Sequence, residues 1–155
     1  MRYIILFIIF VFNIGCTSKP LLEDVVQLTL GTEFEKAGEA YFSSDGSRVI
    51  FQAIPIDKDD DVLDKHYSMY VADICKLDGT IKGIENVIRV SPPLSANTCG
   101  WFYPNSNNRI IYATTGGPMG ISNVPGYQRD ERDYRWDFPP EMDIVEALIN
   151  DGQVE

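Results

Sequence analysis

Short apolar runs separated by polar turns cover most of the chain and predict strands rather than helices. Residues 49–51 and 110–112 are runs of β-branched and aromatic side chains, which favour strands. Asp45-Gly46 precedes the first run, and the glycine accepts the positive φ that a tight hairpin turn needs. Both runs are apolar without alternation, which is typical of strands buried on both faces. The pattern therefore predicts an all-β chain of antiparallel hairpins.

Three pairs of segments match in the same order, so the chain repeats itself with a period of roughly 60 to 70 residues. The first pair alternates apolar and polar residues. The second combines an aromatic pair, a polar turn, an Arg and a β-branched run, and the third is an apolar stretch closed by Asp-Gly. Each repeat therefore predicts two hairpins and four strands. The pairs are 26–29 with 88–91, 40–53 with 100–114, and 69–80 with 142–153.

Four-stranded antiparallel units at this spacing are typical of β-propeller blades, which must stack to bury their apolar faces. We expect residues 40–91 to form one blade and 100–155 an incomplete blade with a long loop at 115–140. Residues 25–30 predict an orphan outer strand. About two blades cannot close a ring, so we expect either a fragment of a longer propeller or association through open blade faces. A sandwich whose hairpins look alike by chance is the alternative.

The segment AYFSSDGSRVIF (40–51) resembles the TolB-like propeller repeat, whose core reads aromatic-Ser-Pro-Asp-Gly-Lys/Arg-aliphatic-aliphatic-Phe. Ser44 stands where that family has Pro, and Asn105-Ser106 replaces Asp-Gly in the second unit. Segments 67–74 and 134–147 also resemble strands of such blades. The resemblance covers residues 25–155 and implies an incomplete TolB-like propeller. Its implied role is a non-enzymatic module that binds proteins or ligands in the bacterial cell envelope.

The N-terminal residues predict export. The apolar run 3–12 is too short to span a bilayer as a helix, which needs about 20 residues, and fits a secretory signal peptide over residues 1–15. Cys16 follows small residues, as in the lipidation box of bacterial lipoproteins, although Asn13 replaces an aliphatic residue there. This resemblance implies a lipid anchor on Cys16, a linker over 16–24 and an outer-membrane lipoprotein on the periplasmic side. An uncleaved anchor or a plain signal peptide are the alternatives.

The charge balance narrows the class of partner. The formal net charge is −10, with 23 acidic and 13 basic residues, so the chain repels phosphate backbones and nucleic acid is excluded as a partner. An envelope protein or a small ligand remains. Export into an oxidising compartment permits a disulfide between Cys75 and Cys99, while two separate thiols are equally compatible with the spacing.

No group of residues predicts catalysis, a cofactor or a metal site. His66 is the only histidine, and no Gly-x-Ser-x-Gly nucleophile motif is present. Asp57, Asp59 and Asp61 alternate like the start of a calcium loop, but Val62 stands where that loop needs Gly. We therefore expect a protein that is not an enzyme. The alternative is the N-terminal propeller fragment of a larger envelope enzyme of the serine peptidase or polysaccharide lyase type.

The long loop at 115–140 is the candidate partner-contact surface. Loops of this length are usually functional or disordered, and aromatic and arginine side chains are favoured at interface hot spots. Packing against the blade is the alternative role. The candidate contact residues are Tyr127, Arg129, Arg132, Tyr134, Arg135 and Trp136.

Replacing Cys16 with Ser tests the predicted anchor. Cys16→Ser removes the thiol that would carry the lipid, so the exported chain should lose its acyl label and leave the membrane fraction. Cys99→Ser should keep both. Membrane association that is unchanged in Cys16→Ser would refute lipidation at that position.

Overall fold

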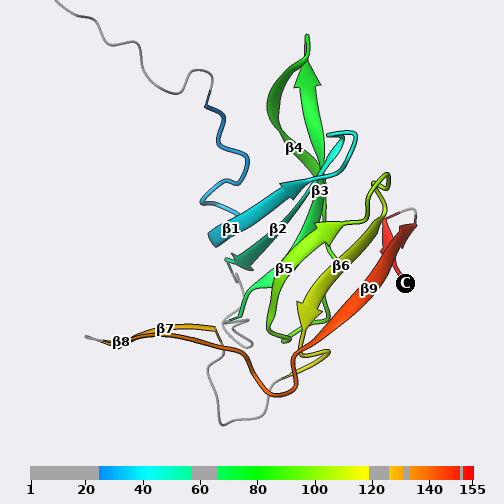
Figure 1. Ribbon diagram of the computed structural model, residues 1–155. Coiled ribbons are helices and arrows are strands. Elements are labelled where there is room, and N and C mark those ends of the chain that lie inside the picture. Colours follow the sequence, from blue (N-terminus) through cyan, green and yellow to red (C-terminus); the bar gives the residue numbers. More distant parts are fainter. Residues whose placement is uncertain (1–24, 57–65, 119–125, 131–132, 151) are drawn as a thin grey trace, which may run out of the picture.

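The computed structural model describes residues 25–56, 66–118, 126–130, 133–150 and 152–155. These residues form strands and turns, and none of them belongs to a helix that could cross a membrane. Figure 1 shows two four-stranded sheets packed together and a separate hairpin. The prediction of an all-β chain with antiparallel four-stranded sheets is confirmed. The described part of the chain does not close into a ring.

The first sheet is an antiparallel meander in the order β1-β2-β3-β4. Asp78 and Gly79, with φ of 51° and 77°, form the two-residue turn between its last two strands. Such turns need positive φ at both positions, which explains the Asp-Gly sequence. The strands are β1 (Phe34–Phe42), β2 (Arg48–Pro55), β3 (Ser68–Leu77) and β4 (Thr80–Arg89).

The second sheet has the order β10-β9-β6-β5 and is also antiparallel. A hairpin of two further strands, β7 and β8, is inserted in the chain between β6 and β9 and forms its own sheet. The strands of the second sheet are β5 (Asn97–Phe102), β6 (Arg109–Thr114), β9 (Asp143–Asn150) and β10 (Gln153–Val154), and those of the hairpin are β7 (Gly126–Asp130) and β8 (Asp133–Asp137).

The β1–β2 and β5–β6 hairpins have the same register. In both, the aromatic pair at the end of the first strand lies opposite the two β-branched residues of the second. In both, the register shifts just before that pair, where a bulge inserts one residue. The first bulge residues, Glu39 and Cys99, have φ of 44° and 56°. The matching Cα partners are Tyr41↔Ile50 and Phe42↔Val49 in the first sheet, and Trp101↔Ile111 and Phe102↔Ile110 in the second.

Matching residues of the two hairpins also touch each other across the sheets. The rings of Tyr41 and Trp101 stack with centroids 3.9 Å apart. The bulge residue Glu39 reaches Thr98, beside the second bulge, with an oxygen–oxygen distance of 3.2 Å. The turns meet as well, where the backbone N–H of Asn105 donates to Ser44 Oγ at 3.0 Å. The second sheet is therefore a copy of the first, displaced along the stack with its matching hairpin in the same orientation.

The main core lies between the sheets. We call the faces in contact the inner faces and the opposite ones the outer faces. On the first sheet, Ile50, Met69 and Val71 are at most 1% exposed on the inner face. They pack against Ile110, Tyr112, Ala147 and Ile149 of the second sheet. Ile50 and Ile111 occupy matching positions in the two hairpins. Ile50 points to the inner face of the first sheet, whereas Ile111, next to the inner-face residues Ile110 and Tyr112, points to the outer face of the second. The inner face of the first sheet therefore corresponds to the outer face of the second.

The two outer faces differ. On the first sheet, Phe34, Phe51 and Tyr70 form an aromatic cluster with ring centroids 5.0 to 5.7 Å apart, and each is at most 8% exposed. This face is covered. On the second sheet, Ile144 of the outer face is 73% exposed. The stack is therefore closed at one end and open at the other.

The structure corrects several sequence boundaries. Residues 25–30 form no strand, and Leu30 accepts hydrogen bonds from the N–H groups of Glu33 and Phe34 in a turn that leads into β1. The first sheet starts at residue 34 instead of 40. The second sheet has a short fourth strand, Gln153–Val154, and the expected loop at 115–140 contains the β7–β8 hairpin.

Replacing Gly100 with Ala tests the close approach of the sheets. A Cβ at Gly100 would lie 2.6 Å from Ile50 Cδ1 and closer still to Met69 Cε, and both side chains are fully buried. Overpacking of this kind costs about 1–3 kcal/mol, so Gly100→Ala should lower the free energy of unfolding by that amount in a urea titration. Gly83→Ala, with no heavy atom within 4 Å of its Cβ, is the control and should change it little. Equal effects would contradict this packing.

Candidate functional site

A polar network starts in the β1–β2 turn at Asp45. Its Oδ1 accepts hydrogen bonds from the Oγ of Ser43 and from both the N–H and the Oγ of Ser47, at 2.7 to 2.9 Å. Its Oδ2 accepts from Asn107 Nδ2, in the matching turn of the second sheet, at 3.1 Å. Hydrogen bonds to an ionised carboxylate favour its charged form. The backbone N–H of Ser47, followed by the hydroxyls of Ser47 and Ser43, holds the pKa of Asp45 well below its usual range.

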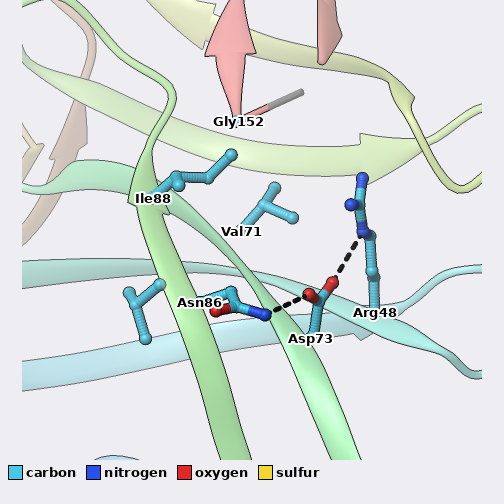
Figure 2. A pocket seen from close by; sticks show the side chains of 7 residues that line it. Arg48, Val71, Asp73, Asn86, Ile88 and Gly152 are labelled. Atoms are coloured by element: carbon cyan, nitrogen blue, oxygen red, sulfur yellow. Dashed lines mark hydrogen bonds and ion pairs between the residues drawn. The ribbon is translucent and has the colours of Figure 1, made fainter. Parts of the chain in front are cut away.

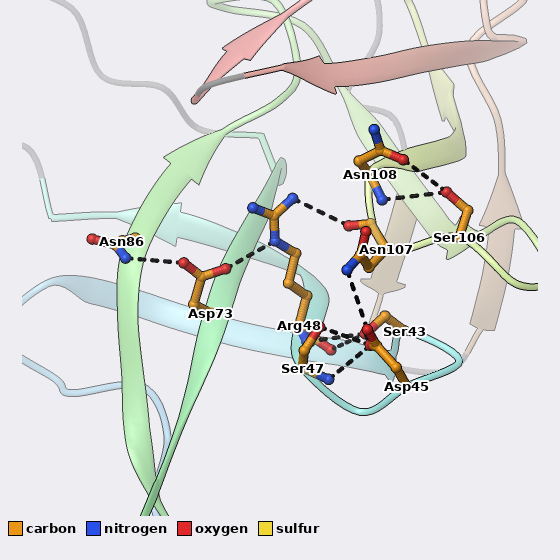
Figure 3. Close-up of polar contacts among 9 residues, drawn as sticks. All are labelled: Ser43, Asp45, Ser47, Arg48, Asp73, Asn86, Ser106, Asn107 and Asn108. Carbon is orange, nitrogen blue, oxygen red and sulfur yellow. Dashed lines mark hydrogen bonds and ion pairs between the residues drawn. The ribbon is translucent and has the colours of Figure 1, made fainter.

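Arg48 continues the network across the two sheets. Its Nε donates to Asp73 Oδ1 at 2.8 Å, and its Nη1 donates to the carbonyl of Asn107 at 3.2 Å. Asn86 donates to the other oxygen of Asp73 at 2.9 Å. Figure 3 shows these contacts running from the β3–β4 hairpin to the turns of both sheets. Arg48 therefore holds the second sheet's turn against the edge of the first.

This network borders an open cleft between the sheets. The cleft has a volume of about 370 Å³ and is lined by side chains of β2, β3 and β4, with Gly152 of the β9–β10 turn opposite them. Figure 2 shows the Arg48–Asp73–Asn86 group at one side and the apolar side chains of Val71 and Ile88 at the other. An apolar wall with a few fixed polar groups is suited to binding a small ligand.

The second sheet has a corresponding ion pair on its outer face. Arg109 donates to both carboxylate oxygens of Glu146, at 2.6 and 2.8 Å, and its guanidinium lies 4.1 Å from the ring centroid of Tyr103. Tyr103 also donates to Glu146 at 2.9 Å. The hydrogen bonds from Arg109 and Tyr103 lower the pKa of Glu146, and the same contact with Glu146 raises the pKa of Tyr103. This group places charge on an otherwise apolar face.

The two cysteines for which the sequence permits a disulfide are not bonded to each other. Cys75 lies in β3 and Cys99 in the β5 bulge, and both thiols are free. Partial burial, and then the nearby carboxylate of Glu85, raise the pKa of the Cys75 thiol. A raised pKa keeps that sulfur protonated and a weak nucleophile.

The predicted partner-contact residues fall on the β7–β8 hairpin. Its strands pair Tyr127 with Trp136 and Arg129 with Tyr134, while Arg135 lies opposite Gln128. The hairpin thus brings together, by register, five of the six predicted residues. The sixth, Arg132, lies outside the described residues, as do Cys16 and the acidic run 57–61.

The described residues do not assemble a metal-binding group of three or more His, Cys, Asp or Glu side chains. The cleft is lined by Arg48, Asp73 and Asn86, which bond each other or the backbone, and by apolar residues. This arrangement can hold a ligand by shape and hydrogen bonds. Comparisons with protein-family models, curated proteins and solved structures find no match to the chain.

Sequence reasoning did not single out the network residues. The sequence pattern marks Asp45-Gly46 only as a turn and Arg48 only as part of the repeat. No sequence motif marks Asn107, Asp73 or Asn86, because the residues that they contact are distant in the sequence. The one usable signal is that each repeat has an Arg at the start of its second strand and an acid in its third.

Acid unfolding tests the role of Asp45. Because folding lowers its pKa, Asp45 contributes stability above the pKa of the unfolded chain, near 4, and loses that contribution as pH falls further. Asp45→Asn should lower stability at pH 7 and flatten the fall in stability between about pH 5 and pH 2. Urea titrations across this range measure both effects. An unchanged pH dependence in Asp45→Asn would contradict the network.

Proposed function

We propose that the chain is a non-enzymatic, exported binding module built from β-propeller-type blades. The observation that carries this proposal is that the two sheets are copies with matching bulges and touching equivalent residues. Stacked repeats of one four-stranded unit are how propellers are built. The sequence resemblance to TolB-like repeats and the predicted signal peptide and Cys16 lipid anchor add the periplasmic side of the bacterial envelope as its location.

The proposed partner surface is the β7–β8 hairpin. It is inserted between β6 and β9 of the second sheet and forms a sheet of its own. Among the residues whose burial the structure describes, the core residues come from the other strands and the segments beside them. Five of its residues are of the aromatic or arginine types that dominate interfaces. The partner is an envelope protein, with the inter-sheet cleft as the site for a small ligand.

Site-specific crosslinking in the periplasm tests this assignment. A photoreactive amino acid at position 128, in the hairpin, should give a discrete protein adduct, and Trp136→Ala should reduce that adduct without changing the melting temperature. The same reagent at the exposed position 82, in β4, is the control and should give none. Adducts that are absent, or identical from both positions, would refute the hairpin as a partner surface.

A further inference from the structure

The chain contains Asp-Gly sequences at residues 45–46, 78–79 and 151–152. At such a sequence the backbone nitrogen of the glycine can attack the side-chain carboxyl carbon of the aspartate, because glycine has no side chain to shield that nitrogen. The fold decides whether the two groups are free to meet. Asp151 lies outside the described residues, so the structure allows a comparison of the first two turns.

The Asp45-Gly46 turn restrains both reacting groups. The Asp45 carboxylate accepts hydrogen bonds from its own turn and from the second sheet, and these stabilise its charged form. A carboxylate must gain a proton before its oxygen can leave as water, so these bonds oppose the reaction. The N–H of Gly46 donates to the carbonyl of Ser43 at 2.9 Å, and the carbonyl of Gly46 accepts from Lys76 Nζ at 2.8 Å.

The Asp78-Gly79 turn lacks these restraints. It forms the tip of the β3–β4 hairpin, which projects beyond the other strands (Figure 1). Residues 76–80 are all exposed, and Leu77 beside the turn is 62% exposed. Within the described structure, no hydrogen bond engages the carboxylate of Asp78 or the N–H of Gly79. Both groups are therefore in water and free to approach each other.

We propose that Asp78 is a site of spontaneous conversion to isoaspartate. The nitrogen of Gly79 forms a bond to the protonated carboxyl group of Asp78, and the carboxyl hydroxyl leaves as water together with the amide proton. The cyclic imide then adds one molecule of water. Cleavage between the nitrogen and the original backbone carbonyl leaves the chain connected through the former side chain, whereas cleavage on the other side restores Asp78. The water lost is regained, so no oxidant, reductant or cofactor is needed.

The product lengthens the backbone of the turn by one methylene carbon. A two-residue turn with positive φ at both positions fits the ordinary backbone length, so the pairing of Leu77 with Thr80 next to it should open. The buried residues of β3, among them Met69 and Val71, lie at the other end of the strand. The change therefore alters an exposed hairpin tip and leaves the fold intact. The rearrangement does not depend on export or on a partner.

Ageing the folded full chain at neutral pH tests the proposal. After digestion, an isoaspartyl peptide elutes separately from the original peptide at unchanged mass, and it accepts a methyl group from an isoaspartyl methyltransferase used as a reagent. The peptide that contains Asp78 should accumulate isoaspartate several-fold faster than the peptide that contains Asp45. Asp78→Glu should abolish the signal from the tip, because the longer side chain would have to close a larger ring.

Unfolding provides the control for local sequence. In urea the protection of Asp45 disappears, so both Asp-Gly peptides should convert at similar rates. In the folded chain, Ser47→Ala removes one hydroxyl bond to Asp45 and should speed conversion there while leaving the rate at Asp78 unchanged. Equal rates at the two sites in the folded chain, or the same difference between them in urea, would overturn the proposal.

Discussion

Strands β2 and β3 are apolar on both faces, and the need to bury both faces is the constraint on which the rest of the structure depends. Ile50 and Val71 point to one side of the first sheet, and Val49 and Ala72 to the other, and all four are at most 2% exposed. A single sheet cannot bury both sides. The second sheet covers one side, and on the other side Phe34, Phe51 and Tyr70 of the first sheet itself pack into a buried aromatic cluster. Stacking is therefore a requirement of the sequence pattern.

The polar contacts then decide how the sheets stack. Apolar burial alone is not directional and would tolerate several relative positions. The turns meet through Asp45 and Asn107, and Arg48 bonds both Asp73 in its own sheet and the carbonyl of Asn107 in the next. These bonds bring matching turns together and leave the cleft beside Arg48 open. The candidate binding site is thus a product of the same contacts that align the repeats.

The hairpins and the repeat can be predicted from the sequence, because β-branched runs and Asp-Gly turns are local signals. The register of the strands, that is, which residues lie opposite each other, cannot. Aligning the Asp-Gly turns pairs Val71 with Ile144, whereas the strand ladders pair Val71 with Glu146. A shift of two residues keeps every side chain on the same face, so the hydrophobic pattern cannot detect it. The cleft and its ion pair depend on contacts distant in sequence, which no local pattern contains, and residues 25–30, expected as a strand, form none.

The central claim is that the two sheets are copies of one unit whose matching residues touch. The most direct test is the contact between Tyr41 and Trp101, whose rings are stacked with centroids 3.9 Å apart although they lie in different sheets. Nuclear Overhauser effects measured between the ring protons of these two residues should be strong. Their absence, with Trp101 showing contacts only within its own sheet, would contradict the stacked repeat.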